Sequence, residues 1–388
     1  VISLLINLFL GVSMGANVII SNHIGQNDEE GIQKAVSTAF TTAIVSGLIL
    51  MCLGVAAAKP ILTIMGTPDD VLTLAATYLR IYFLGIPFFL IFNFGAAILR
   101  SMGDTKRPLY ILVIAGIVNT VLNLFFVIVL KMSVAGVAVA TGIANLVSAL
   151  LIIRLLCKEK APFRLHLNKI GVVWSELKRM LMIGIPAGLQ GMVFSFSNVL
   201  LQTAINGYGS DAIAGSAAAL NFEYYCYFVI AAFNGAAISF IGQNYGAGNK
   251  ERVKRIYWIC LTLSVVCCGA LNELFVWQHS FFLSFFSNDP NVQAYGATRM
   301  DIVLAWQFIA SSYEISASSL RGMGKSMLPT ILTVFGTCLL RIVWVSAVCP
   351  VWHTFDVIML VYPVSWCLTG IMVCTAYYIT ARKKLAGA

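Results

Sequence analysis

Charged side chains are scarce in this sequence. They make up 11% of its 388 residues, whereas 59% of the residues are hydrophobic, and a typical soluble domain is roughly one quarter charged. A soluble protein of this size could not bury so much apolar surface. Uncharged runs of about 20 residues, the length that crosses a bilayer core, recur at 35–58, 109–130 and 357–379. The sequence therefore predicts an all-α integral membrane protein.

Residues that carry out catalysis or bind metals are few and scattered. The ten cysteines lie mostly inside apolar stretches and form no C-x-x-C pair, which is typical of small packing residues in helices. The four histidines are far apart in the sequence, so we expect no metal site. H-E-x-x-H, G-x-S-x-G and phosphate-loop patterns are also missing from the sequence. We therefore expect neither an enzyme nor a bound cofactor.

Eleven segments are long and apolar enough to span a membrane. They lie at about 1–21, 35–57, 74–99, 108–130, 134–157, 180–206, 212–242, 254–277, 293–320, 328–350 and 356–381. Alternate connections between them hold 20 of the 25 basic residues. Because basic loops stay in the cytoplasm, we expect a multi-pass protein of the cytoplasmic membrane with a cytoplasmic C-terminus. The net charge of +9 reflects this asymmetry and requires no nucleic-acid partner.

Two nearly identical stretches indicate an internal repeat. "LRSMGDTKRP" (99–108) and "LRGMGKSMLP" (320–329) lie 221 residues apart, and the same offset places 23–35 over 244–256. Six predicted spans separate the two stretches, so the chain returns in the same orientation. We therefore expect two parallel halves related by a pseudo-twofold axis along the membrane normal.

The repeat also implies a missing helix. Residues 180–221, which hold the first helix of the second half, correspond to positions before Val1. We therefore expect a truncated sequence whose parent has two six-helix lobes, of whose twelve helices about eleven are present. The expected organisation is an N-terminal lobe at 1–157, a cytoplasmic linker at 158–179 and a C-terminal lobe at 180–388.

Each repeated stretch contains an arginine, a glycine and a proline at matching positions. The glycine is suited to end one helix, and the proline to open the next, where a missing N–H costs nothing. The arginine can bond carbonyls of the last turn or lipid phosphates at the cytoplasmic boundary. We expect these residues to position the turn, and a cytoplasmic gate is the alternative. They are Arg100, Gly103 and Pro108 in the first turn and Arg321, Gly324 and Pro329 in the second.

The two turns, together with "GQNYGAGNKERV" (242–253), resemble the multidrug and toxic compound extrusion (MATE) family over essentially the whole chain. The resemblance implies an antiporter that exports small organic, often cationic, compounds or drugs in exchange for H⁺ or Na⁺. We expect the protein to be a monomer. Two lobes would alternate around a central cavity in the lipid bilayer. A flippase for lipid-linked saccharides, a task of related folds, is the alternative. It is less favoured because few basic residues lie well inside the spans.

Two acids inside the predicted spans are candidates for ion coupling. Glu314 lies six residues before the second turn, and Glu223 lies in the outer half of its span. An ionisable group at such depth is costly and is therefore a functional candidate. The alternative is a structural ion pair with Arg341, which is deep enough to need an acid partner.

Other candidates are neutral. Asn93, the repeat counterpart of Glu314, and Asn123 could contribute neutral ion ligands, although such residues more often bond neighbouring helices. Many members of the resembled family have an Asp where Asn123 stands in "NTVLN" (119–123), and many carry an acid in the first helix, which is missing here. The complete ion sites of that family therefore cannot be assigned to this sequence. Candidates for the substrate cavity are Gln190, Asn198, Tyr224, Tyr227 and Tyr313, and the aromatic ones could stack on organic cations.

Overall fold

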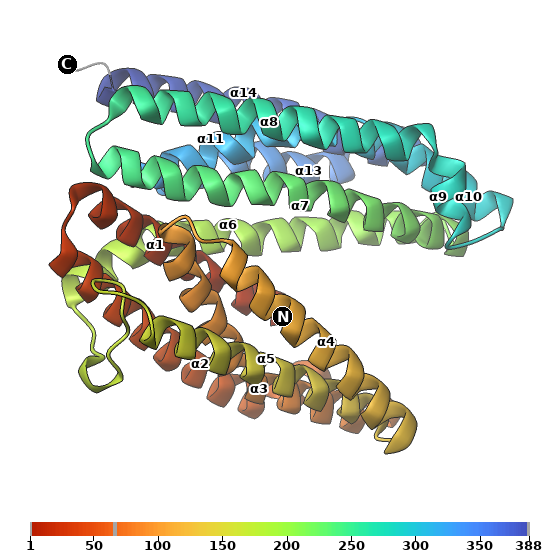
Figure 1. Ribbon diagram of the computed structural model, residues 1–388. Coiled ribbons are helices and arrows are strands. Elements are labelled where there is room, and N and C mark those ends of the chain that lie inside the picture. The colour runs from red at the N-terminus through yellow and green to blue at the C-terminus, as the bar shows by residue number, and fades with distance from the viewer. Residues whose placement is uncertain (1, 65–67, 386–388) are drawn as a thin grey trace. The chain divides into compact units, whose positions relative to one another are not determined.

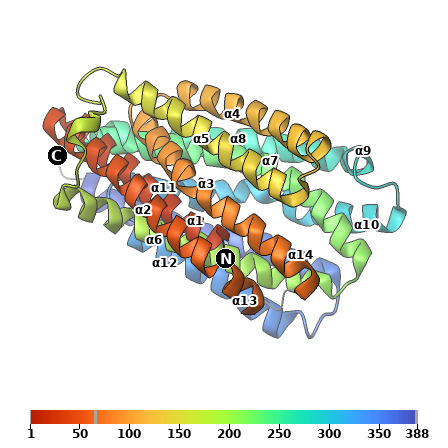
Figure 2. The ribbon, with the colours of Figure 1, turned by 90° about the horizontal axis from the view of Figure 1, so that it is seen from below.

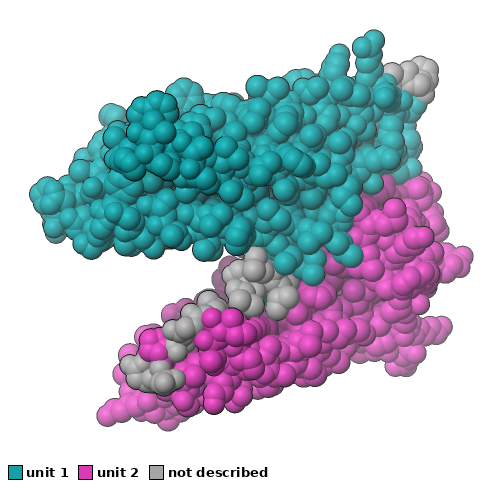
Figure 3. Space-filling view, turned by 180° about the vertical axis from the view of Figure 1, so that it is seen from behind, with its two compact units in different colours: residues 1–8, 185–388 teal, residues 9–184 magenta. Residues whose placement is uncertain are grey.

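The computed structural model describes residues 2–64 and 68–385, and all regular secondary structure within these ranges is helical. Residues 1, 65–67 and 386–388, which belong to the predicted lobes, lie outside the described residues. The chain divides into two compact units, coloured separately in Figure 3. The N unit comprises residues 9–184, and the C unit comprises residues 1–8 and 185–388. The predicted division into transport lobes stays a prediction.

The N unit is built from five long helices and the start of a sixth. It contains most of α1 (Ile2–Gln26), then α2 (Glu29–Ile64), α3 (Asp69–Ser101), α4 (Lys106–Leu124), the π-helical turn η1 (Phe125–Val129), α5 (Ser133–Cys157), the short 3₁₀ helix η2 (Leu167–Lys169) and the first part of α6 (Trp174–Asn206). Within this unit α3 packs against both α2 and α5, and α4 lies beside α5 (Figure 2).

The C unit contains the rest of α6 and all later elements. The α-helices are α7 (Ser210–Gly246), α8 (Lys250–Trp277), α9 (His279–Ser284), α10 (Pro290–Arg299), α11 (Ala310–Gly322), α12 (Met327–Thr333), α13 (Leu340–Val343) and α14 (Phe355–Leu385). The π-helical turns are η3 (Met300–Leu304), η5 (Val334–Leu339) and η6 (Trp344–Val348), and η4 (Gln307–Ile309) is a 3₁₀ turn. Within this unit α11 lies among α7, α8 and α14 (Figure 1).

The helix boundaries confirm the repeat predicted from the sequence. Helices α2, α3 and α4 begin at residues 29, 69 and 106, and α8, α10 and α12 each begin 221 residues later, at 250, 290 and 327. The 221-residue offset therefore holds for the helices as well as for the two repeated turns.

Both LR-x-MG turns have the same backbone geometry. Gly103 and Gly324 have positive φ angles of 85° and 75°, where a side chain is strained. In the first turn the Gly103 and Asp104 amides donate to the Arg100 and Leu99 carbonyls, and the second turn repeats both bonds. These are the two bonds of a Schellman helix end. In each case the proline is the third residue of the following helix.

Ten helices of the described residues are long and apolar enough to cross a membrane. The eleventh predicted span, at 293–320, is divided into α10, η3, η4 and α11, with an irregular residue at Trp306 (φ −104°, ψ 3°). The segment contains no proline, so this break could not be predicted from a helix-breaking residue. Interruptions of this π-helical kind often occur at functional sites.

Small residues let helices approach closely within each unit. A Cβ added to Gly47 of α2 would lie 2.6 Å from the Cα of Pro87 in α3, and one added to Gly215 of α7 would clash with the carbonyl oxygen of Val292 in α10. Membrane helices pack through such small residues because lipid provides no hydrophobic force between them.

Candidate functional site

The helix at the centre of the C unit is polar. Its sequence, "ASSYEISASSLRG", is almost entirely buried. Ser316 and Ser319 donate to carbonyls one turn earlier in the helix, and Ser311 accepts from Ser264 of α8. The Ser318 hydroxyl has no hydrogen-bond partner in the described part of the chain. A core helix with so many hydroxyls and one acid is unusual in a membrane protein and is a functional candidate.

Glu314 of α11 is a buried carboxylate with one neutral partner. Its side chain is 7% exposed, and its Oε2 accepts from Asn234 Nδ2 of α7 at 3.0 Å. No basic group lies within ion-pair distance of it among the described residues. Asn234 Oδ1 is buried and has no hydrogen-bond partner there either. The amide nitrogen of Asn234 therefore faces the carboxylate, and a rotation of the amide would turn its oxygen toward Glu314. Carboxylate and amide oxygens bind protons and hard cations.

Arg321, the arginine of the second turn, is a buried residue of the same helix, α11, seven residues after Glu314. Its Nη2 donates to Gln190 Oε1 of α6 at 2.6 Å, and its Nε has no partner within the described ranges. The expectation that Arg321 reaches carbonyls or lipid phosphates at the boundary is therefore wrong. Arg321 lies on a helix enclosed by its neighbours, so its side chain meets α6 instead. The structure thus brings two predicted residues, Arg321 and Gln190, into contact.

Glu223 of α7 forms an ion pair, with a partner that the sequence analysis missed. Arg299 Nε donates to Glu223 Oε1 at 2.5 Å and Nη2 donates to Oε2 at 3.0 Å. Arg299 also donates to Ser216 Oγ at 2.6 Å, and both charged side chains are buried. Gln307 Nε2 donates to the Glu223 backbone carbonyl. This two-bond geometry links α7 to α10, and ion coupling by Glu223 stays a prediction.

The predicted ion pair of Arg341 is wrong. Among the described residues no acid lies within ion-pair distance of Arg341. Its Nη1 donates to Asn198 Oδ1 at 2.9 Å, and its guanidinium lies over the Tyr362 and Phe194 rings at 4.7 and 5.4 Å. Amide and aromatic groups, rather than a carboxylate, therefore stabilise this cation.

The three candidate tyrosines differ in exposure. Tyr224 and Tyr227 of α7 are about half exposed, at 52% and 41%, whereas Tyr313 of α11 is packed in the core. Only the first two present rings at a surface of the C unit. Their role in a substrate cavity stays a prediction.

The asparagine candidates of the N unit form neutral hydrogen bonds. Asn93 donates to the Phe89 carbonyl of its own helix at 2.8 Å. Asn123 donates to Asn119, which donates to Thr141 of α5 at 3.3 Å. This chain of bonds links α4 to α5, which is the structural role that such residues usually have. Ion binding by Asn93 or Asn123 stays a prediction.

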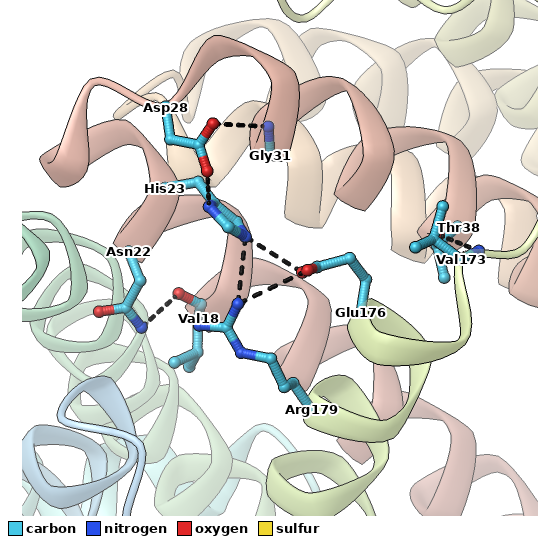
Figure 4. Close-up of polar contacts among 9 residues, drawn as sticks. All are labelled: Val18, Asn22, His23, Asp28, Gly31, Thr38, Val173, Glu176 and Arg179. Carbon is cyan, nitrogen blue, oxygen red and sulfur yellow. Dashed lines mark hydrogen bonds and ion pairs between the residues drawn. The ribbon is translucent and has the colours of Figure 1, made fainter.

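A cluster of ionisable residues in the N unit was also missed by the sequence analysis (Figure 4). His23 Nδ1 lies 2.9 Å from Asp28 Oδ2, and its Nε2 lies 3.1 Å from Glu176 Oε2 and 3.3 Å from Arg179 Nη1. The Gly31 amide donates to Asp28 Oδ1, which lowers the pKa of Asp28. His23 thus joins the end of α1, the start of α2 and the start of α6.

The path of the chain before α6 explains why this cluster forms. The Gly171 amide donates to Ser37 Oγ at 2.9 Å, and the Val173 amide donates to Thr38 Oγ1 at 3.1 Å. These bonds hold the segment before α6 against α2, so that Glu176 and Arg179 come to lie beside His23 (Figure 4). His23 and its partners on α6 are more than 150 residues apart in the sequence, so no local sequence pattern could predict these contacts.

Comparison with known proteins decides the family. The sequence model of the MatE family matches residues 1–125 and 186–345, which is more than half of the chain. The chain belongs to the MatE family. The resemblance to MATE transporters seen in the turns is thereby confirmed.

Relatives and solved structures agree with this assignment. Probable multidrug resistance protein YoeA of Bacillus subtilis (strain 168) is 26% identical over 343 residues, which cover 86% of this chain and 73% of that protein. Probable multidrug resistance protein NorM of Thermotoga maritima is 27% identical over 342 residues, covering 84% and 71%. A crystal structure of MATE in complex with MaL6 has a TM-score of 0.91 at 19% identity, covering 100% of this chain and 87% of that one. This structural likeness shows the fold. The MatE-family chain is thus a multi-pass membrane transporter and not an enzyme.

Proposed function

We propose that this protein exports small organic, mainly cationic, compounds across the cytoplasmic membrane in exchange for H⁺ or Na⁺. Its membership of the MatE family and its similarity to proteins named multidrug resistance proteins support drug export. In this proposal the turns face the cytoplasm, and the two predicted lobes alternate in exposing the substrate site to each side of the membrane.

The observation that carries ion coupling is the surroundings of Glu314. Its carboxylate is buried, has no basic partner within ion-pair distance among the described residues, and accepts a hydrogen bond from the Asn234 amide. Arg321 of the same helix interacts with it electrostatically from beyond that distance. A carboxylate without a direct ion-pair partner is costly to bury in the ionised form. A proton on Glu314 would remove that cost. A sodium ion between the carboxylate and Asn234 Oδ1 would also remove it, once the amide has rotated.

Glu223 is a weaker candidate for the same task. The two hydrogen bonds from Arg299 already neutralise its charge. Binding a proton or Na⁺ there would require breaking this pair and would leave a buried guanidinium without a partner. We therefore assign ion exchange to Glu314 and a structural role to Glu223.

Efflux from cells that express the full-length protein tests this proposal. Ethidium efflux is measured while the Na⁺ gradient and the pH gradient are imposed separately. We expect wild-type efflux to respond to one of the two gradients and Glu314→Gln to lose that response. Glu314→Asp, which keeps the charge, should retain part of it. Glu273→Gln is the matched control, because Glu273 is an exposed acid of the same unit.

Each possible result has a clear meaning. Wild-type efflux that responds to neither gradient would reject antiport. Gradient-dependent efflux by Glu314→Gln at the wild-type level would reject the role of Glu314 but not export itself. The amounts of folded protein in the membrane are compared by size-exclusion chromatography, so that poor folding is not mistaken for lost coupling.

A further inference from the structure

The C unit contains a pocket that the proposed transport mechanism does not use. It has a volume of about 790 Å³, which is within the range of small-molecule sites, roughly 300–1,000 Å³. All of its lining residues belong to α8 and α14, near the start of α8 and the end of α14. They are Lys254, Tyr257, Trp258, Cys374, Thr375, Tyr377, Tyr378, Ala381 and Arg382.

One wall of the pocket is formed by two stacked tyrosines. The rings of Tyr257 and Tyr377 lie 3.8 Å apart at an angle of 22°. The Tyr257 hydroxyl is hydrogen-bonded to Ser316 of α11 at 3.0 Å. The Tyr377 hydroxyl is buried without a hydrogen-bond partner in the described part of the chain, and the residue is only 5% exposed. Buried hydroxyls nearly always have a partner, so a ligand in the pocket would provide the missing acceptor.

The rim of the pocket is positively charged. Lys254 and Arg382 line it, and Lys254 has a single ion pair, with the largely exposed Glu251 at 3.1 Å. Such a surface pair is weak and exchanges readily. Arg382 is exposed and forms no ion pair within residues 2–64 and 68–385. These charges are complementary to an anion and oppose an organic cation.

The position of the pocket favours a lipid over a soluble anion. Trp258 and Tyr378 line it and are 61% and 67% exposed, and these residue types are enriched at the depth of lipid headgroups. The apolar faces of two membrane helices continue from there. Basic pockets between membrane helices bind anionic headgroups.

We propose that this pocket binds an anionic phospholipid. Lys254 and Arg382 hold the headgroup phosphate, the Tyr377 hydroxyl donates to one of its oxygens, and the acyl chains follow the exposed faces of α8 and α14. This proposal does not depend on the transported compound or on the coupling ion.

Lipid binding to the purified full-length protein in detergent tests it. Phosphatidylglycerol and phosphatidylcholine are titrated, and the thermal unfolding temperature is recorded. We expect phosphatidylglycerol to bind roughly twentyfold more tightly, because each basic group near an anionic surface contributes several-fold. The pocket variant Lys254→Gln/Arg382→Gln should lose this preference. The control variant Arg255→Gln/Lys383→Gln removes the same charge from exposed neighbours that do not line the pocket, and it should keep the preference.

Two further arms make the outcome decisive. Tyr377→Phe should weaken phosphatidylglycerol binding while leaving the unfolding temperature without lipid unchanged or raised, because it removes an unpaired hydroxyl. Glycerol phosphate, a headgroup without chains, should not stabilise the protein. Equal losses in the pocket and control variants, no preference for phosphatidylglycerol in the wild type, or full stabilisation by glycerol phosphate would each overturn the proposal.

Discussion

The two repeats differ most at one pair of equivalent positions. Asn93 of α3 and Glu314 of α11 lie 221 residues apart and each lies seven residues before the arginine of its turn. Among the described residues Asn93 bonds to its own helix, whereas Glu314 accepts a hydrogen bond from α7. The duplication thus preserved the backbone of the turns and the starts of the helices, while the interiors diverged.

The distribution of charge shows the same divergence. In the C unit, Glu223, Arg299 and Arg341 are buried inside helical segments. In the N unit the buried ionisable pair His23 and Glu176 lies at helix ends. A turn has to satisfy backbone geometry, which leaves few choices of residue, whereas helix interiors can accept new polar groups when a partner is supplied. The C unit is therefore the one in which we expect mutations of charge to matter.

The largest effect is expected from breaking the buried pair of the C unit. Arg299→Met leaves Glu223 buried without a counter-charge and should lower the free energy of unfolding by about 3–5 kcal/mol. Thermal unfolding in detergent measures this. The double variant Glu223→Gln/Arg299→Met should recover part of the loss. The equivalent residue of the N unit is Tyr78, and Tyr78→Phe should have little effect. Equal losses at Arg299 and Tyr78 would contradict the comparison.

Replacing Glu314 by Asn and Asn93 by Glu should have different effects on efflux and on stability. Glu314→Asn removes the proposed ion site and should abolish gradient-dependent efflux with little loss of stability. Asn93→Glu places an acid where the described structure gives Asn93 a bond to the Phe89 carbonyl, and it should cost about 2 kcal/mol of stability without adding ion dependence. Efflux and unfolding are measured on the same preparations. A stable Asn93→Glu variant that restores coupling to Glu314→Asn would show that the two positions are interchangeable.

The turns should respond alike, because their geometry is shared. Gly103→Ala and Gly324→Ala each force a side chain to a positive φ angle and should cost about 1–2 kcal/mol. Gly116→Ala in α4 is the control, because an added Cβ meets nothing within 4 Å there, and it should be neutral or stabilising. Unfolding temperatures that differ strongly between the two turn variants would show that the turns have diverged after all.

The smallest effect on stability is expected from the protonation of Asp104, in the first turn, at acidic pH. Burial raises the pKa of Asp104, but hydrogen bonds from the Arg107 side chain and backbone outweigh it, so the pKa lies below its ordinary value of 3.8. The ionised Asp104 carboxylate therefore stabilises the folded protein fully above pH 3.8, and this contribution is lost as the pH falls through the lower pKa of the folded state. Unfolding temperatures should fall more steeply in this window for the wild type than for Asp104→Asn. The second turn has Lys325 at this position and should contribute no such acid dependence.

The sequence predicted the features that are local or repeated. Span positions follow from uncharged runs, and the glycine and proline positions of the turns follow from backbone rules that act over a few residues. The contacts of the buried charges could not be predicted in this way. The sequence analysis offered Arg341 as the ion-pair partner of Glu223, whereas the structure pairs Glu223 with Arg299, 76 residues away in sequence. The His23 contacts depend on the path of the segment before α6, for which no periodic pattern exists.

The interruption between α10 and α11 separates two tasks. Arg299 ends the segment before it, and Glu314 lies in the segment after it. A single rigid rod would pass any rotation at one of these side chains directly to the other. In the proposed mechanism, two rods joined by an irregular link would let the carboxylate gain and release its ion while the guanidinium stays bonded to α7. The rearrangement that accompanies ion exchange would then be confined to the segment that follows the interruption.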